Sequence, residues 1–302
     1  MKRTISTLLL VILSTASTIA AENPIYNELV EKGVEMSNGE LVALPPPIVP
    51  DGLDAAGQQA AMKKATDART TLKDLLKKTP YAPVMVKVRS AQVDPSKDDG
   101  PMVRKIDLWF VTYGDWDVMT SKDFLESTLQ SKDEEANRVV LRAGELTKAE
   151  LDSRQLTAIT TPELEERFLY STFRMFDRVQ VGATRFSALT RDENSILAAG
   201  RLDPRFLDDP EYPNEWRPLL RNPQAEIEPG PAHPFAHAGG YAKITRLIEP
   251  AGAVWIECHI VFEEPYGWFD GVNLIRQKIP VMVNEKIKVF RRKLMSASDE
   301  SE

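Results

Sequence analysis

The chain of 302 residues has few of the residue types that build disulfides, metal sites and general-base sites. It contains one cysteine and three histidines. A single cysteine excludes an intramolecular disulfide, so the fold must depend on a buried hydrophobic core, for which this length is ample. Cys258 falls on the apolar side of a predicted strand, which favours a buried and unreactive thiol.

The familiar local motifs of catalysis are also absent. The sequence has no Gly-x-Ser-x-Gly elbow, no phosphate loop, no Gly-x-Gly-x-x-Gly and no His-Glu-x-x-His. We therefore predict no catalytic residues and no cofactor, and the sequence favours a protein that is not an enzyme. A hydrolase without a local signature, with its site built from the proline-rich loop at 204–234, is kept as an alternative.

The histidines and the paired carboxylates do not have the spacing of a metal site or of a glycosidase site. A zinc site would need His233, His237 and His259 to converge with a carboxylate, and their spacing does not place them on one face. We therefore expect no metal site. Glu257 and Glu263 share one side of a strand but lie about 20 Å apart. Glycosidase carboxylates lie about 5–10 Å apart, so these two are not such a pair.

The charge balance is acidic, with 38 lysines and arginines against 45 aspartates and glutamates and a net charge of −7. An acidic chain without a basic stripe argues against nucleic acid and against anionic membrane surfaces as partners. Several cations, including Lys286, Lys288, Arg291, Arg292 and Lys293, gather near the C-terminus. Cations there suit the dipole of a helix end, and a contact site for an acidic partner is the alternative.

The first twenty residues predict a signal peptide. Lys2 and Arg3 precede an apolar stretch at 8–13, and small residues follow at 18–20. We expect cleavage between Ala20 and Ala21 and export to the periplasm or the cell exterior. An uncleaved anchor is the alternative. No later apolar run is long enough to cross a bilayer, so no transmembrane segment is expected in the mature chain.

The clearest folding pattern lies between residues 239 and 295. At 254–263 apolar residues alternate with polar ones, which predicts an antiparallel strand with one buried side. A partner strand is predicted at 241–248, joined by a turn at 249–252. An amphipathic helix follows, and Pro280 is predicted to end one short helix and begin another.

The rest of the chain alternates predicted strands, helices and loops. Strands are expected at 84–88, 104–113, 139–144, 179–189 and 196–202, and helices at 23–39, 55–78, 121–132, 147–154 and 162–176. The stretch 204–238 is rich in proline and is predicted to be a loop lying over the sheet. The fold class is α+β: a curved antiparallel sheet of about seven strands packed against a long C-terminal helix, with extra N-terminal helices. The expected organisation is a signal peptide at 1–20, a helical and proline-rich segment at 21–79, the α+β domain at 80–295 and a disordered tail at 296–302.

A curved antiparallel sheet closed by a long C-terminal helix resembles the helix-grip architecture of START-like lipid-binding domains. The resemblance rests on residues 241–294, and the chain is otherwise similar to uncharacterised exported bacterial proteins. It implies an apolar small molecule or lipid bound between the sheet and the last helix. The residues expected to line that space are Trp255, Tyr266, Trp268 and Ile279. A non-catalytic interaction or structural protein of the cell envelope, with a filled core, is the alternative.

Overall fold

A computed structural model describes residues 22–121, 140–224 and 226–299. Its helices are α1 (Pro24–Glu31), α2 (Ala55–Met62), α3 (Leu72–Leu75), α4 (Trp116–Thr120), α7 (Lys148–Asp152) and α8 (Leu274–Asp299), with 3-10 turns η1 (Lys63–Ala65), η2 (Pro204–Phe206) and η3 (Tyr266–Trp268). Its strands are β1 (Val34–Glu35), β2 (Leu41–Val42), β3 (Met85–Gln92), β4 (Met102–Tyr113), β5 (Val140–Glu145), β6 (Leu164–Met175), β7 (Val179–Arg191), β8 (Ser195–Leu202), β9 (Glu215–Arg221), β10 (Ile227–Pro229), β11 (His233–Pro234), β12 (Ala238–Arg246) and β13 (Ala253–Glu264).

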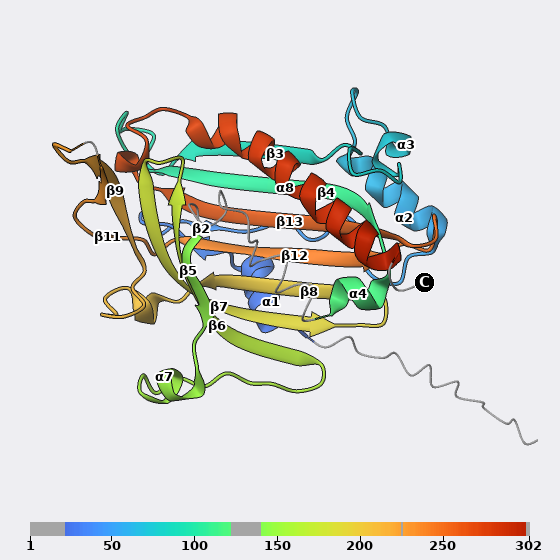
Figure 1. Ribbon diagram of the computed structural model, residues 1–302, viewed down its shortest axis with the longest axis horizontal. Helices are drawn as coiled ribbons and strands as arrows, with labels where there is room; N and C mark the ends of the chain where they lie inside the picture. Colours follow the sequence, from blue (N-terminus) through green and yellow to red (C-terminus); the bar gives the residue numbers. More distant parts are fainter. Residues whose placement is uncertain (1–21, 122–139, 225, 300–302) are drawn as a thin grey trace, which may run out of the picture.

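Eleven strands form one antiparallel sheet, in which β3, β4, β13, β12, β8, β7, β6 and β5 follow one another (Figure 1). One side of the long β7 pairs with β6. On its other side, residues 185–191 pair with β8 and residues 179–182 pair with β9. The predicted α+β class, with an antiparallel sheet packed on a long C-terminal helix, is confirmed. The number of strands is larger than the seven expected.

The sheet has two covered faces, which β13 distinguishes. Ile256 and Cys258 point to the side on which α8 lies, the front face, where they join a cluster with residues of β4 and α8. Trp255 points to the opposite side, the rear face, where it packs with residues of α2 and α3. Figure 1 shows α8 in front of the sheet and α1 behind it. The strand is therefore buried on both sides, and the prediction of a single buried side is wrong.

The N-terminal segment covers the rear face. Asn23 caps α1 by accepting a hydrogen bond from the Tyr26 amide, and its side-chain amide donates to the carbonyls of Ala188 and Leu197 at 3.0 and 3.3 Å. One buried side chain thus begins the helix and attaches it to β7 and β8. The helix ends at Gly33, whose φ of +94° and close approach to the Val42 backbone suit only glycine.

The last helix is continuous. The break predicted at Pro280 is wrong, since α8 runs from Leu274 to Asp299 with the proline inside it. Because proline has no amide hydrogen, the helix lacks the bond that residue 280 would donate to the Arg276 carbonyl. One turn later, the side chain of Asn284 donates to the Pro280 carbonyl at 2.7 Å. Ile275 before the proline and Leu294 after it are both fully buried, so packing on both sides of Pro280 keeps one axis. Four residues of the predicted disordered tail, 296–299, are helical.

Arg291 attaches the second half of α8 to the edge of the sheet. Its guanidinium donates to the carbonyls of Val111 (2.7 and 3.0 Å), Ala82, Pro80 (3.3 Å) and Pro83 (3.3 Å). The side chain is 2% exposed, and burial lowers its pKa to about 10. The sequence grouped this residue with the surface cations of the helix end, whereas it satisfies backbone carbonyls inside the protein.

Three further segments differ from prediction. Residues 162–176, read as a helix, contain strand β6, whose aromatic residues fit either periodicity. The predicted long helix at 55–78 is divided into α2, η1 and α3. The proline-rich stretch contains the short strands β9, β10 and β11, which lie at the edge of the sheet where proline is tolerated. The helix predicted at 121–132 lies almost entirely outside the described residues.

Candidate ligand-binding face

The front face has an open floor beside α8. The helix packs on β3 and β4, while β8, β7 and β6 lie to one side of it in Figure 1. On these inner strands small residues face one another: Gly200 pairs with Gly240 and Ala198 pairs with Ala242. Ile260, which pairs with Gly240, remains 42% exposed although it lies on an inner strand of the sheet. These five residues are named the floor: within the described ranges Ile260 is exposed and Ala198, Gly240 and Ala242 are half-buried.

One cation lies on this floor. Arg185 of β7 reaches solvent, and burial of its surroundings lowers the pKa of its guanidinium. A Cβ at position 200 would lie 3.0 Å from Cδ of Arg185, so the glycine lets the arginine stem lie along the sheet. Within the described residues Arg185 has no hydrogen bond or ion pair. By contrast Arg167, on the same face of β6, is paired with Glu165 and lies 3.7 Å from Glu145.

The predicted lining residues occupy three different environments. Trp268 and Ile279 belong to one hydrophobic cluster of the front face, at the end of the floor near the start of α8. Tyr266, two residues earlier, is 45% exposed. Trp255 points to the rear face and is fully buried there, so it does not lie between the sheet and α8. Alternate residues of a strand point to opposite faces, and Trp255 points to the rear face, whereas the predicted lining required the front face.

The rear face contains a buried polar network. His259 Nδ1 lies 2.8 Å from Asp107 Oδ1, and its Nε2 lies 3.6 Å from Glu257 Oε2. Arg89 pairs with the other oxygen of Asp107. Burial alone would lower the pKa of His259, but the two carboxylates raise it. Burial alone would raise the pKa of Asp107, but the hydrogen bond with His259 and the charge of Arg89 lower it.

The proline-rich segment at 44–51, named the strap, covers this network. The amides of Ile48 and Val49 donate to the Glu257 carboxylate at 2.8 and 3.3 Å. Lys243 donates to the Val49 carbonyl at 3.1 Å and pairs with Asp51 at 2.9 Å. His259 and Glu257 are 1% and 0% exposed. These two side chains are buried under the strap, and their hydrogen bonds and ion pairs hold the strap on the rear face.

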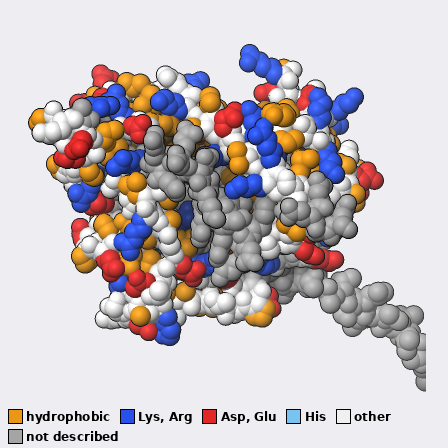
Figure 2. All heavy atoms as spheres, in the orientation of Figure 1, with side chains coloured by type: hydrophobic (Ala, Val, Ile, Leu, Met, Phe, Trp, Pro, Cys, Tyr) orange, Lys and Arg blue, Asp and Glu red, His pale blue; other side chains and the backbone are white. Residues whose placement is uncertain are grey.

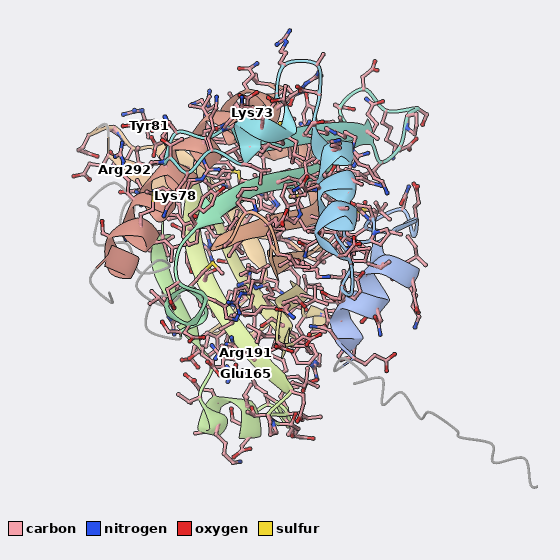
Figure 3. The ribbon with its side chains drawn as sticks, turned by 90° about the vertical axis from the view of Figure 1, so that its right-hand side faces the viewer. Lys73, Lys78, Tyr81, Glu165, Arg191 and Arg292 are labelled. Atoms are coloured by element: carbon pink, nitrogen blue, oxygen red, sulfur yellow. The ribbon has the colours of Figure 1, made fainter. Side chains whose placement is uncertain are left out.

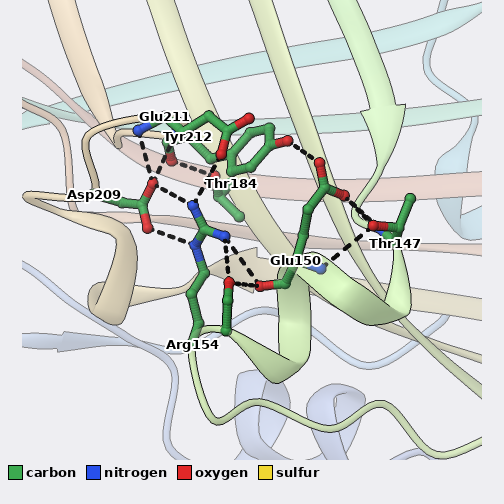
Figure 4. A network of polar contacts seen from close by, with 8 residues as sticks. Thr147, Glu150, Arg154, Thr184, Asp209, Glu211 and Tyr212 are labelled. Atoms are coloured by element: carbon green, nitrogen blue, oxygen red, sulfur yellow. Dashed lines mark hydrogen bonds and ion pairs between the residues drawn. The ribbon is translucent and has the colours of Figure 1, made fainter.

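A second polar network joins α7 to the segment after η2 (Figure 4). Arg154 donates to the Asp209 carboxylate at 2.7 and 3.1 Å, and Tyr212 donates to Glu150. The hydrogen bond with Tyr212 lowers the pKa of Glu150 to about 2, and the same bond raises the pKa of Tyr212 to about 12. Each of these ionisable groups has a hydrogen-bond or ion-pair partner, and the network attaches α7 to the segment after η2. This network includes the proline-rich stretch, where the alternative hydrolase site was placed, and it leaves no free base or nucleophile among these groups.

The histidines and the cysteine do not assemble into a reactive site. His233 stacks on Trp216 with ring centroids 4.5 Å apart, and His237 contacts the Glu35 carbonyl at 2.7 Å, whereas His259 lies in the rear network. In the ranges that the structure describes, no group of three or more His, Cys, Asp or Glu side chains is placed to hold a metal ion. Burial raises the pKa of Cys258 to about 12, so its thiol is protonated and unreactive at neutral pH.

Two open surface pockets lie away from the floor. One of about 490 Å³ is formed by turns around Gly52, Gln58 and Arg246, and one of about 230 Å³ lies around Thr161 and Arg191. Neither contains Arg185 or a predicted lining residue. None of the described helices combines the length and the apolar character that a membrane crossing requires.

No family model and no curated protein matches the chain. Among solved structures it is similar to the crystal structure of human STARD10, with 11% identity, 83% of this chain and 84% of that chain covered and a TM-score of 0.39. It is also similar to the human StarD13 (DLC2) lipid transfer and protein localization domain, with 6% identity, coverage of 70% and 84% and a TM-score of 0.38. Both similarities extend over most of this chain, beyond the residues 241–294 on which the START-like resemblance was predicted.

Proposed function

We propose that the protein is an exported, non-enzymatic binder of an amphipathic small molecule or lipid, held on the front face beside α8. The observation that supports this most is the floor itself, where an exposed isoleucine and four small residues lie next to Arg185, which has no ion pair within the part of the chain that the structure describes. Export is proposed because residues 1–20 have the composition of a signal peptide.

The floor combines the two contacts that an amphipathic ligand needs. Ile260, Ala198 and Ala242 offer apolar surface to a hydrocarbon or ring system, and burying that surface on both partners favours binding. Arg185 offers an exposed guanidinium, whose planar set of N–H donors can bind a carboxylate or phosphate through two hydrogen bonds. A carboxylate or a phosphate group on an apolar body satisfies both contacts. The ligand class is therefore an anionic amphiphile.

Native mass spectrometry tests this proposal. The chain from Ala21 onward, which contains every described element, is purified without detergent and weighed, and bound material is extracted with organic solvent. We expect an adduct with a carboxylate or phosphate group, and the mass of the extract distinguishes the two. Replacing Arg185 with Gln removes the charge-assisted hydrogen bonds and should lower occupancy about tenfold or more.

Two variants complete this experiment. Arg201→Gln is the matched control, because Arg201 is on the neighbouring strand but points to the rear, where it pairs with Glu28 at 3.3 Å. It should keep the adduct. Ala242→Phe fills the floor and should abolish binding while leaving the far-ultraviolet circular dichroism spectrum unchanged. A protein at its bare mass that takes up neither added fatty acid nor phospholipid would contradict the proposal, as would full occupancy in Arg185→Gln.

The second candidate function is an interaction or structural protein of the cell envelope. The exposed apolar side chains on the outer side of α8 favour it, because they point away from the sheet and from the floor. A bare protein mass in the experiment above would favour this candidate.

A further inference from the structure

The outer side of α8 carries apolar and cationic side chains in alternation. Val281, Met282 and Val289 are 64%, 38% and 41% exposed on a helix whose other side is buried against the sheet. Residues three and four apart lie together along a helix. Two neighbouring rows result, one with Val281, Glu285, Lys288 and Arg292, and one with Met282, Lys286, Val289 and Lys293.

The cations of these rows are largely uncompensated. Lys288 pairs with Glu285 at 2.6 Å, and that is the one acidic side chain of the two rows. Lys286 and Lys293 are exposed and have no partner among the described residues. Figure 2 shows lysine and arginine side chains lying beside hydrophobic ones on the face of the molecule that α8 crosses.

An exposed tyrosine extends the surface to the loop after α3. Tyr81 is 66% exposed, Arg292 donates to its hydroxyl at 2.7 Å, and Lys288 and Arg292 lie 5.9 and 5.4 Å from its ring centroid. Lys73 belongs to α3 and Lys78 to the loop that follows it, and Figure 3 shows Lys78 near Tyr81 and Arg292. Asp74 is the acidic residue there, and it pairs with Lys77 at 2.8 Å.

We propose that this surface, formed by the outer side of α8 and the region 73–81, docks on an anionic lipid membrane. Exposed aliphatic side chains and a tyrosine bordered by lysines and arginines match the boundary between headgroups and acyl chains. Lysine stems extend along apolar surface while their charges stay in the headgroup layer. An acidic protein would be recognised by the cations alone and would leave the three apolar side chains unexplained.

The composition of the chain conceals this surface. A net charge of −7 argues against anionic membranes when the sequence is averaged. The fold instead brings the cations of two distant segments, 73–78 and 286–293, to one side of the molecule. The proposal goes beyond ligand binding and does not depend on it, because the surface contains none of the floor residues and does not include Arg185.

Vesicle co-sedimentation tests the proposal on the chain from Ala21 onward. Vesicles of phosphatidylcholine alone are compared with vesicles of phosphatidylcholine mixed with phosphatidylglycerol. We expect binding to the mixed vesicles, weakening as salt rises because the attraction is screened. The double variant Lys286→Glu and Lys293→Glu should weaken binding by about 25-fold or more, taking about fivefold for each cation near an anionic surface.

A matched double variant controls for the change of net charge. Lys32 and Lys97 are exposed and lie outside the proposed surface, and Lys32→Glu with Lys97→Glu should leave vesicle binding within about twofold because a change of net charge elsewhere is screened beyond a Debye length. Val281→Ser with Val289→Ser should weaken binding several-fold without changing its salt dependence. Circular dichroism and thermal melting confirm that each variant is folded. Equal loss in both charge variants, equal binding to neutral vesicles, or no binding at all would overturn the proposal, and none of these results depends on an adduct at the floor.

Discussion

On the rear face of the sheet Glu257 and His259 are completely buried, whereas on the front face Ile260 of the same strand keeps 42% of its surface exposed. Polarity and burial are thus reversed between the two faces. The rear groups can be buried because polar partners face them: the strap amides donate to Glu257, and Asp107 is hydrogen-bonded to Nδ1 of His259. The front floor has an arginine without a partner and apolar surface without a cover among the described residues. The first face stabilises the fold, and the second is available to a ligand.

If the rear face stabilises the fold, the largest loss of stability is expected from truncating Trp255. Its side chain is 0% exposed and packs with residues of α2, α3 and β4. Trp255→Ala removes this packing and should lower the free energy of unfolding by about 3–5 kcal/mol. Urea unfolding followed by circular dichroism measures the loss.

The front-face counterpart is Ile260→Ala. Because Ile260 is already partly in water, its truncation should cost only about 1 kcal/mol. The same variant should weaken ligand uptake, which Trp255→Ala should retain in the molecules that stay folded. Equal destabilisation by the two substitutions would remove the distinction between a stabilising and a binding face.

The rear network predicts an intermediate effect that depends on pH. The pKa of His259 is raised in the folded protein, so its contribution is present below the unfolded value of about 6.5 and is lost as pH rises through the folded value. The pKa of Asp107 is lowered, so its contribution is present above about 3.9 and is lost as pH falls. Relative to His259→Gln, the native protein should be more stable by about 3 kcal/mol between about pH 4 and 6.5.

Urea unfolding of both proteins from pH 3 to pH 9 gives this difference directly. Hydrogen exchange at the amides of Ile48 and Val49, which donate to Glu257, reports whether the strap loosens with the network. His233→Gln is the control, since His233 stacks on an edge tryptophan away from the network. A stability difference that stays constant over the whole pH range would show that His259 acts only by filling space.

Much of the fold follows from sequence patterns, because the decisive signals are local. The alternation on β13, the turn with Pro250 and Gly252, and the helical spacing after Val272 predict the β12–β13 hairpin and the long last helix. The errors occur where tertiary contacts override local preference. The packing of Ile275 and Leu294 on the sheet keeps α8 continuous through Pro280, and the apolar residues of β6 fit a helix as well as a strand.

The candidate site was harder to predict, since it depends on register across four strands. Trp268 and Ile279 were placed on the front face correctly, but their role in binding stays a prediction. Arg185 gives no signal in the sequence, because nothing local shows that Gly200 lies beside it or that no described acidic side chain pairs with it. Glu257 and His259 were assigned to a solvent side, because the strap that covers them is about 200 residues away in the chain.

The smallest effect on stability is expected at Arg185, where the loss of binding should be largest. Arg185 forms no described hydrogen bond or ion pair, so Arg185→Gln should change the free energy of unfolding by no more than about 0.5 kcal/mol. Arg104, on the same face, is the informative comparison: it is 3% exposed and pairs with Glu264, and it donates to Asn273 at 3.1 Å. Arg104→Gln leaves a buried carboxylate without its cation and should cost about 3–5 kcal/mol. Thermal melting of the two variants distinguishes an arginine that stabilises the fold from one that is available to a ligand. A large loss of stability in Arg185→Gln would mean that the guanidinium already interacts with groups of the protein.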